Sequence, residues 1–483
     1  MNLFSLRGAV RFRVRDLWRQ ALAALLILVC IPVLTATAAD QKMFPQDSVL
    51  RATLENGLRV VIVRNDLAPV ATTMINYLAG SNEDPKGSPG QAHALEHMMF
   101  RGSPDLTAGQ LANIVAELGG KFNAMTQPTV TQYFLTVPAE DLDVALRIEA
   151  IRMKGLLSTE DLWREERGAI DQEVVRDLSS PEYLFYTKLL ENMFKSTPYA
   201  NSGLGTTASF ARIAGAELKQ FHEAWYVPNN AVLVIVGKVD PARTLETIKK
   251  YFGSIPCRKT PVRPAVQFKP VQPNTIRLTT GNPYGLYILA FRMPGYSNRD
   301  YPASEVLNDI LNSTRGDLFN LVIDGKALMT GFELMTYPET GIGLVVAAFP
   351  DGRNPAPLIR DVKRILRKNI RRGFPSDLVD SAKRKRLTQA ELEKNSVQGM
   401  AMSWSEAVAV QGRSSPDQTK LEIARVTSSE VNRVARKYLL FDHAIAAGPD
   451  RLLCGSDPAE ARAEAVLRRP RRLRELEASR RGE

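Results

Sequence analysis

The chain has 483 residues, of which 44% are apolar and 24% charged, and its formal net charge is +11. This length predicts two or more globular domains with sizeable cores. The three cysteines, Cys30, Cys257 and Cys454, are too few and too far apart for a disulfide framework or a cysteine-rich metal site. A metal site in this chain would therefore need imidazole and carboxylate ligands.

The N-terminus has the pattern of an export signal. Five arginines precede an apolar run over residues 21–36, and the small-x-small sequence Ala36–Ala38 follows it. The run is shorter than the roughly 20 apolar residues that a membrane-spanning helix needs. We therefore expect a signal peptide at residues 1–38 and a mature protein in the periplasm or another exported compartment. The alternative is an uncleaved signal that anchors the chain to the inner membrane.

Much of the positive charge lies at the two ends of the chain. Residues 1–38 contribute five Arg against one Asp, and residues 458–483 contribute eight Arg against five Glu, which leaves about +4 for the body. The body thus gives no indication of a nucleic-acid partner. We expect the tail at 458–483 to be disordered or partly helical, and the alternative is weak electrostatic contact with a membrane.

The first elements of the body are predicted from turn and cap signals. Asn56 and Gly57 lie between two runs of strand character and predict a hairpin. Residues 72–80 predict a further strand. Ser88 and Pro89 then predict the N-cap and first-turn proline of a helix that ends near Gly102.

The next elements again combine helices and strands. Thr107 and Gln110 predict a capping box for a second helix, which the glycines at 119–120 end. Two strands are expected over residues 121–126 and 130–138. Helical patterns follow at 139–155 and at about 159–178.

Two long stretches of the body recur. The sequence from Glu217 has a counterpart from Glu430 with the same order of amphipathic helix, bend and apolar strand. The sequence from Thr159 pairs in the same way with that from Pro375, at nearly the same offset in numbering. These repeats predict two α+β halves. We expect the domains at 46–257 and 274–450, with a proline-rich linker at 258–273.

Two of the four histidines lie in the stretch HALEH at residues 93–97. On a helix, His93, Glu96 and His97 share one face. Two imidazoles one turn apart can hold a zinc ion, and the carboxylate can reach a water molecule beside it. This order inverts the common H-E-x-x-H pattern and occurs in zinc peptidases. The alternative is an ordinary pair of surface or core histidines.

A third ligand would strengthen the zinc hypothesis. Glu173 is the candidate, because it lies on the helix predicted for residues 159–178. Glu166 precedes it by two helical turns and therefore lies on nearly the same face.

These motifs carry a family resemblance. The stretches HALEH, GGKFNAMT, ERGAIDQE and YVPNNAVLVIVGKVD occur in this order, with ERGAIDQE ending at Glu173. In them the sequence resembles the pitrilysin/insulinase family of zinc metallopeptidases, in the subgroup of two-domain subunits that includes the mitochondrial processing peptidase. The resemblance covers nearly all of residues 46–450. It implies two homologous α+β halves, each a mostly antiparallel sheet packed with helices, arranged as a clamshell.

The resemblance also implies roles for the residues of the motifs. One zinc ion would be bound by His93, His97 and Glu173, with Glu96 as the general base of peptide hydrolysis. Glu166 would be an additional catalytic acidic residue near the site.

The stretch KFNAMT resembles the family's edge strand beside the metal site. Asn123 and Ala124 would therefore pair with the backbone of an extended peptide by strand addition. The alternative is that Asn123 only begins a turn.

The second half departs from the family pattern. The family there carries an Arg and a Tyr that bind substrate near the metal, whereas this chain has Ile323 and Thr330 at the matching positions. We therefore expect a zinc endopeptidase acting on peptides or unfolded polypeptides, with a homologous subunit that supplies the Arg/Tyr pair in a heterodimer. A homodimer, a catalytically silent structural subunit and a polypeptide-binding module without turnover are the alternatives.

Overall fold

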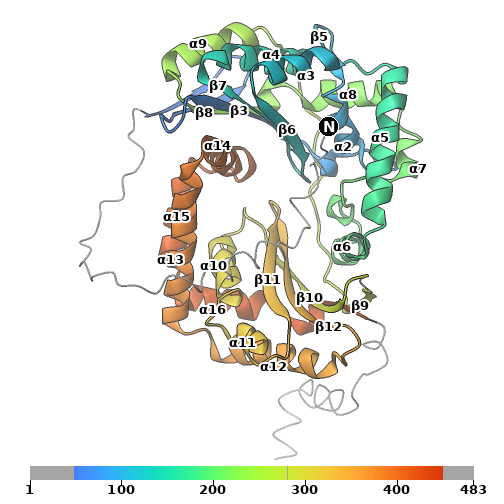
Figure 1. The fold of residues 1–483 in the computed structure, drawn as a ribbon, viewed down its shortest axis with the longest axis vertical. Coiled ribbons are helices and arrows are strands. Elements are labelled where there is room, and N and C mark those ends of the chain that lie inside the picture. The colour runs from blue at the N-terminus through green and yellow to red at the C-terminus, as the bar shows by residue number, and fades with distance from the viewer. Residues whose placement is uncertain (1–47, 280, 450–483) are drawn as a thin grey trace, which may run out of the picture.

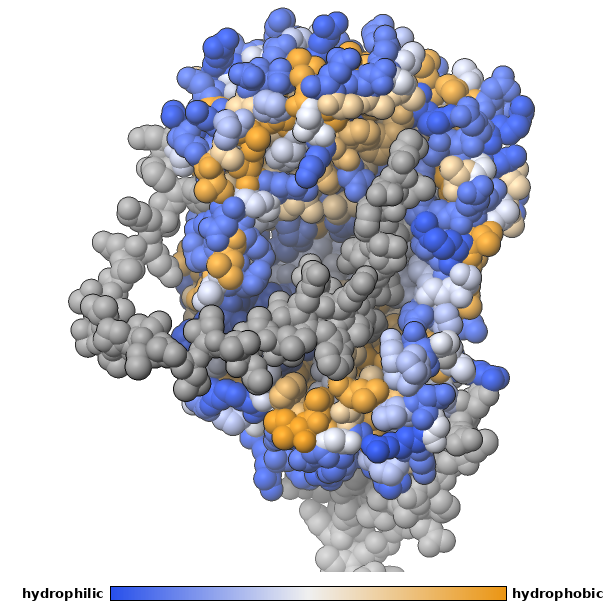
Figure 2. Space-filling view, viewed as in Figure 1, coloured by the Kyte–Doolittle hydropathy of each residue, from blue (hydrophilic) through white to orange (hydrophobic). Residues whose placement is uncertain are grey.

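The computed structural model describes residues 48–279 and 281–449, and the predicted signal peptide and basic tail lie outside these residues. The chain forms two halves of mixed helices and strands that face each other (Figure 1). The predicted fold class is therefore confirmed. Hydrophilic residues cover most of the face seen in Figure 2, and hydrophobic residues gather near the centre of the first half and in a patch on the lower part of the second half.

The first half is a six-stranded sheet with helices. In chain order it contains β1 (Val49–Thr53), β2 (Arg59–Arg64), β3 (Val70–Tyr77), α2 (Gln91–Met98), β4 (Gly102–Ser103), β5 (Leu106–Thr107), α3 (Ala108–Glu117), β6 (Lys121–Thr126), β7 (Thr131–Pro138), α4 (Leu142–Lys154), α5 (Glu160–Leu178), α6 (Pro181–Met193), α7 (Thr207–Phe210), α8 (Gly215–Trp225), β8 (Ala231–Gly237) and α9 (Pro241–Phe252). The strand order is β1-β2-β8-β3-β7-β6, and only the pair β2–β8 is parallel. Strand β8 is fully buried, as its continuous apolar sequence predicts for a central strand.

The second half repeats this plan with five strands. It contains β9 (Asn274–Arg277), β10 (Tyr284–Pro294), α10 (Tyr301–Leu311), α11 (Asp317–Ile323), β11 (Met329–Thr336), β12 (Thr340–Pro350), α12 (Ala356–Arg372), α13 (Ser376–Leu392), α14 (Val397–Ser405), α15 (Pro416–Arg425), α16 (Ser428–Tyr438) and β13 (Ile445–Gly448). The order β11-β12-β10-β13-β9 mirrors the first sheet, again with one parallel pair, β13–β9. Residues 256–273 join the halves without helix or strand.

The predicted repeat is present in the structure. Helices α8 and α16 have the same length, and each leads into a central strand, β8 or β13. Helices α5 and α13 begin at Glu160 and Ser376, two positions that the sequence repeat makes equivalent. The two halves therefore share the order of their main elements, from β3 to β8 in the first and from β10 to β13 in the second.

The two halves exchange one helix each. Helix α6 of the first half packs its side chains Phe185, Leu189 and Met193 on the sheet of the second half. Its counterpart α14, which begins at the equivalent position of the repeat, packs Met400 and Trp404 on β3 and β8 of the first sheet. This reciprocal packing makes each half part of the other's hydrophobic core.

A polar contact strengthens the packing of α14. The Ser405 hydroxyl lies 2.5 Å from Asn76 Oδ1 on β3, and Gln132 Nε2 on β7 donates to the same hydroxyl at 2.8 Å. All three side chains are buried, so these hydrogen bonds fix the position of α14 on the first sheet.

Several local predictions are confirmed and one is wrong. Strands β1 and β2 form the predicted hairpin, with Gly57 at φ 88°, and Thr107 and Gln110 form the predicted capping box of α3. The motif helix, however, begins at Gln91 with Gly90 as N-cap, and it ends at Met98 rather than near Gly102. Ser88 is not the cap, because the Asp84 carboxyl group accepts the hydrogen bonds of the Gly90 and Ala92 backbone N–H groups at this helix end.

In the parts of the chain that the structure describes, none of the helices combines the length and the apolar character that a bilayer span requires.

Candidate metal centre

The carboxylate of Asp84 anchors the start of the motif helix α2. Asp84 Oδ2 accepts a hydrogen bond from the Gly90 backbone N–H at 2.6 Å, and Oδ1 accepts one from Ala92 at 2.8 Å. These N–H groups have no partner within the helix. Burial raises the pKa of the Asp84 carboxyl group to about 8, and the hydrogen bonds from Ala92 and Gly90 oppose this effect. Gly90 has φ 89°, and a Cβ there would lie 2.5 Å from Cα of Gly205, so glycine is required.

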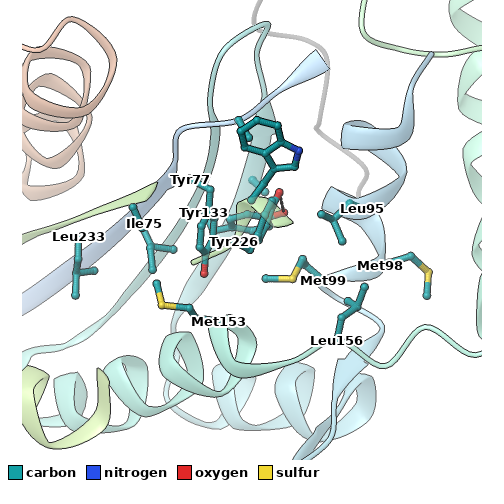
Figure 3. Close-up of a cluster of buried hydrophobic side chains, with 14 of the residues drawn as sticks. Ile75, Tyr77, Leu95, Met98, Met99, Tyr133, Met153, Leu156, Tyr226 and Leu233 are labelled. Atoms are coloured by element: carbon teal, nitrogen blue, oxygen red, sulfur yellow. Dashed lines mark hydrogen bonds between the residues drawn. The ribbon is translucent and has the colours of Figure 1, made fainter. Parts of the chain in front are cut away.

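The opposite face of α2 is fixed by an aromatic cluster. Leu95, Met98 and Met99 belong to the same buried cluster as Tyr77, Tyr133 and Tyr226 in the core of the first half, and Figure 3 shows Met99 directed toward the tyrosines. The rings of Tyr77 and Tyr226 stack with centroids 4.0 Å apart, and the hydroxyls of Tyr133 and Tyr226 are 3.0 Å apart. The helix is therefore held from both its end and its apolar side, which limits the positions of its polar side chains.

Helix α5 brings the distal glutamate to α2. Thr159 caps α5 by accepting a hydrogen bond from the Leu162 N–H, and Trp163 donates from Nε1 to the Ile213 carbonyl at 2.7 Å. The buried side of α5 carries Trp163, Ile170, Glu173 and Val174. Because Glu173 lies on this apolar stripe, the packing of α5 against α2 buries its carboxylate beside the two histidines.

The structure brings His93, His97 and Glu173 together. One potential ligand atom from each lies within 4.8 Å of the others, and His97 Nε2 is 3.5 Å from Glu173 Oε2. The two imidazole rings are 4.8 Å apart and nearly perpendicular. This set of two nitrogens and one carboxylate oxygen matches the ligands of catalytic zinc sites with three protein ligands.

The hydrogen bonds of the two histidines define their tautomers. His93 Nδ1 lies 3.1 Å from the Leu204 carbonyl, and His97 Nδ1 lies 2.8 Å from Glu166 Oε1. Both partners are acceptors, so each Nδ1 carries a hydrogen and each Nε2 is the nitrogen available to a ligand. Such an arrangement, with a carbonyl or carboxylate behind the imidazole, is general for histidines that bind metal.

The surroundings of His97 favour a metal cation at this place. Among the residues described, His97 Nε2 is buried and has no hydrogen-bond partner, a costly state for a polar atom. Burial opposes a positive charge on His97, but Glu166, which is hydrogen-bonded to Nδ1, and Glu173, whose carboxylate lies 3.5 Å from Nε2, outweigh it and raise the pKa of His97 to about 10. The carboxylates therefore favour a positive charge at this place, and the residues present fit zinc.

His93 is in a different electrostatic environment. Burial and the neighbouring His97 lower the pKa of His93 to about 4. His93 is therefore a neutral imidazole at neutral pH, the protonation state that a metal ligand needs.

Glu96 lies outside the set of three ligand residues. Its carboxylate is buried, and Oε2 accepts a hydrogen bond from the Thr126 hydroxyl at 2.5 Å. Burial raises the pKa of Glu96, although the charge of His97 and the hydrogen bond from Thr126 oppose this effect. A carboxylate with a raised pKa beside a metal site is suited to accept and return a proton.

The structure places Glu166 behind His97 rather than among the ligand atoms. Its second oxygen forms an ion pair with Arg101 Nε at 3.3 Å, and Arg101 also contacts Glu165. Glu166 thereby orients the His97 ring. In this geometry Glu166 contacts the His97 ring at Nδ1, the nitrogen that is not the candidate ligand atom.

Asn123 and Ala124 lie on β6, the edge strand of the first sheet. The Asn123 side-chain oxygen accepts a hydrogen bond from the Ala124 N–H at 2.9 Å. Thr126, on the same strand and facing the same side as Ala124, is the donor to Glu96. The edge strand is thus connected directly to the candidate centre.

Sequence reasoning missed four contributors to the centre. Asp84, Arg101, Thr126 and the Leu204 carbonyl contact or support the predicted residues through side-chain or backbone hydrogen bonds. Only the glycines on either side of Leu204, both with positive φ, gave a local signal of close backbone approach.

The positions that replace the family's Arg and Tyr lie in the second half. Ile323 is the last residue of α11 and is 68% exposed. The Thr330 hydroxyl on β11 donates to the Leu318 carbonyl at 3.0 Å. Neither side chain offers a charged or phenolic group.

Models of one peptidase family match the chain in tandem. The model described as "Insulinase (Peptidase family M16)" matches residues 59–207, and that described as "Peptidase M16 inactive domain" matches residues 212–386. The first match contains all three candidate metal ligands, His93, His97 and Glu173.

Named relatives have similar length. The zinc protease PqqE of Helicobacter pylori is 28% identical over 376 residues, which are 76% of this chain and 81% of that protein. An uncharacterized zinc protease of Mycobacterium tuberculosis is 27% identical over 410 residues, 80% of this chain and 90% of that protein.

Solved structures share the fold. The crystal structure of a protease from Helicobacter pylori matches with a TM-score of 0.76 and 24% identity, over 83% of this chain and 99% of that one. The periplasmic protease PqqL of Escherichia coli matches with a TM-score of 0.71 and 19% identity, over 84% of this chain but 48% of that one. With both family models and the fold in agreement, the chain belongs to the M16 (insulinase) family of peptidases.

Proposed function

We propose that this protein is a zinc-dependent endopeptidase that hydrolyses peptides or unfolded polypeptides and binds one zinc ion through His93, His97 and Glu173. The observation that carries the proposal is the convergence of these side chains around a buried His97 Nε2 that has no hydrogen-bond partner among the described residues. The names of the relatives, which are zinc proteases, support it.

The chain's own residues supply the acid–base chemistry. When bound, zinc provides a Lewis acid that polarises the peptide carbonyl and lowers the pKa of water. Glu96 takes the proton of the attacking water and returns it to the leaving amine, because its carboxylate lies on the same helix face as the histidines. Thr126 holds the Glu96 carboxylate in place through its hydrogen bond.

Strand β6 provides a binding surface for substrate. Its outer edge has no strand partner in the sheet of the described residues, so an extended peptide can add to it as a further strand. Asn123 and Ala124 lie at the middle of this edge, and Thr126 connects its end to Glu96. A peptide bound there passes close to the general base.

We further propose that a homologous subunit completes the site. Ile323 and Thr330 cannot stabilise an oxyanion as an arginine and a tyrosine can, and loss of one such donor costs roughly 100- to 1000-fold in rate. Pairing with a chain that has the Arg/Tyr pair would restore the donors. The length of the PqqL chain, of which this chain matches about half, is consistent with two such units acting together.

We propose export to the periplasm as the location. The support is the basic segment and apolar run of residues 1–38, together with the periplasmic location stated for PqqL. N-terminal sequencing of the protein from its native cells should find a mature chain beginning near residue 39. A chain that still begins at Met1 in the membrane fraction would favour the anchored alternative.

The proposed function is tested by comparing the chain with its Glu96→Gln variant, each alone and mixed with the homologous subunit. We expect one zinc per chain in both proteins, weak hydrolysis of an unfolded polypeptide by the chain alone, strong hydrolysis by the mixture and none by the variant. Strong activity without the partner would remove the shared site but keep the zinc chemistry. Zinc binding without hydrolysis in any mixture would contradict the peptidase proposal.

A further inference from the structure

The two halves differ in net charge. Residues 48–257 carry 20 basic and 24 acidic side chains, a net charge of −4, whereas residues 274–449 carry 24 basic and 18 acidic side chains, a net charge of +6. The halves share one fold, so this difference is not a requirement of the architecture. The excess of positive charge in the second half is concentrated on one helix.

Helix α12 carries most of this charge. Its 17 residues include seven basic side chains and one acidic side chain, Asp361. Arg360, Arg364, Arg367 and Arg371 recur at a spacing of four, three and four residues, which places them in one row along the helix. All four are exposed. At 1.5 Å per residue this row is roughly 16 Å long.

The opposite side of α12 is buried in the core of the second half. Leu358, Ile359, Val362, Ile365 and Leu366 are buried in the main hydrophobic cluster of the second half. The arginine row therefore faces away from the core, at the end of the second half remote from the first (Figure 1). It lies far from the candidate metal centre in the fold, so the row has no part in the proposed chemistry.

The equivalent helix of the first half provides an internal comparison. Helix α4 follows β7 as α12 follows β12, and it carries three basic and two acidic side chains, a net charge of +1 against +6 for α12. Both helices cover their own sheet. The row of arginines is therefore an addition to the second half that packing does not explain.

Intramolecular ion pairs neutralise only part of the charge of α12. Arg364 pairs with Asp361 at 2.6 Å, and Lys368 pairs with Asp317 at 3.0 Å. Arg360, Arg371 and Arg372 are exposed, and none of them makes an ion pair or side-chain hydrogen bond with the residues that the structure describes. These three guanidinium groups, two of them in the row and Arg372 beside its end, are free to meet an external anion.

We propose that the arginine row of α12 is a docking surface for anionic phospholipid membranes. An extended row of flexible cations matches an extended anionic surface, and each Lys or Arg close to such a surface strengthens binding about fivefold. None of the exposed large apolar side chains of the described residues lies on α12 itself, so the row is polar along its whole length, although Ile323 on the neighbouring α11 is exposed. The proposed export favours phospholipid over nucleic acid as the available polyanion.

The test uses the mature full-length protein and vesicles of phosphatidylcholine with one quarter phosphatidylglycerol. We expect co-sedimentation with these vesicles at low salt, little with pure phosphatidylcholine, and loss of binding as salt screens the charges. The triple variant Arg360→Gln, Arg371→Gln, Arg372→Gln should bind about 100-fold more weakly. Circular dichroism and zinc content should remain unchanged, because none of the three contacts the candidate centre.

A matched control removes the same charge from the first half. Arg147→Gln, Lys154→Gln and Arg243→Gln neutralise three exposed side chains on α4 and the neighbouring α9. This variant should bind the vesicles almost as the unmodified protein does. Both variants keep the basic tail, so its contribution is the same in each.

Three results would overturn the proposal. Equal losses in the two variants would mean that net charge, rather than α12, determines binding. An unchanged affinity of the α12 variant would assign binding to another part of the chain, such as the tail. Absence of vesicle binding together with tight retention by duplex DNA would identify nucleic acid as the ligand of the row. None of these results bears on hydrolysis, so the proposed function is tested separately.

Discussion

The helix pair α2/α5 of the first half and the equivalent pair α10/α13 of the second half have the same place in the fold, but different side chains meet at the two contacts. In the first pair, two histidines and a glutamate meet, and the half-exposed Arg176 pairs with the second oxygen of that glutamate, Glu173, at 3.6 Å. In the second pair, Arg386 of α13 contacts both Glu305 and Asp309 of α10. The first pair leaves the buried His97 Nε2 without a hydrogen-bond partner among the described residues, whereas the carboxylates of the second pair meet a basic side chain between the two helices. The first contact is therefore suited to a cation, and the second is a structural contact.

The same contrast holds at the starts of the equivalent helices α2 and α10. Asp84 anchors α2 by accepting backbone N–H groups, which keeps the side chains of the helix free. Asp300 at the start of α10 instead accepts from Lys437 and Tyr438 and pairs with Arg433, all on α16. In the second half, the aspartate at the helix start thus holds α10 to α16 through its side-chain contacts. In the first half, the equivalent aspartate contacts only backbone groups of α2, and the polar side chains of α2 face the candidate metal centre.

The largest expected effect comes from making α5 resemble α13. Position 173 corresponds to Gln389 in the repeat, so Glu173→Gln introduces the residue of the second half. The substitution removes one of the three proposed ligands. Zinc affinity should therefore fall by more than the roughly 10- to 100-fold that loss of a supporting residue costs. Chelator competition measures this affinity, and hydrolysis should be lost with the metal.

Glu166→Gln is the graded control for that experiment. It keeps the three ligands but weakens the support behind His97. Its zinc affinity should fall by roughly 10- to 100-fold. If Glu173→Gln retained zinc while Glu166→Gln lost it, Glu166 would be the ligand and the assignment of Glu173 would be wrong.

The second effect comes from making α13 resemble α5. Position 386 corresponds to Ile170, so Arg386→Ile removes the partner of Glu305 and Asp309. Burial raises the pKa of Glu305, and Arg386 opposes this, so removal of Arg386 leaves two carboxylates in poorly solvated surroundings. We expect unfolding in urea to show a loss of about 3 kcal/mol. The exposed neighbour Arg384→Gln should change stability by less than about 0.5 kcal/mol.

The third and smallest effect concerns the pH dependence of stability in the second half. Burial alone would raise the pKa of Asp300, but Lys437, Arg433 and Tyr438 lower it to about 2. A carboxyl group with a depressed pKa stabilises the fold above its ordinary pKa near 3.9, and this contribution is lost as pH falls toward 2. Asp300→Asn should therefore cost about 1 kcal/mol at neutral pH, because solvent screens its half-exposed partners Arg433 and Lys437, and progressively less below pH 4.

Stability curves of the protein and the Asp300→Asn variant, measured between pH 7 and pH 2, check this expectation. Asp377→Asn, which removes an exposed ion pair with Arg315, is the control and should give no comparable pH-dependent difference. A constant difference between the Asp300 variant and the unmodified protein at all pH values would show that packing, rather than charge, explains the effect.

Local signals in the sequence predicted much of the fold because they act over a few residues. The Asn56–Gly57 hairpin and the Thr107 capping box depend on neighbouring backbone groups, and both are present. The repeat was predictable because equivalent helices keep the same apolar spacing. The start of α2 was misplaced for the opposite reason, since its anchor, Asp84, is separated from Gly90 by a loop.

The sequence by itself determined which groups face the candidate centre, because a helix places residues three, four and seven apart on one side. His93, Glu96 and His97 follow from α2 alone, as do Glu166 and Glu173 from α5. The tertiary structure decided how these two faces meet, which nitrogen of each imidazole is available, and that Glu166 lies behind His97 rather than beside the ligand atoms. It also decided the exchange of α6 and α14 between the halves. These features depend on contacts between residues far apart in the chain, and such contacts leave no periodic signal in the sequence.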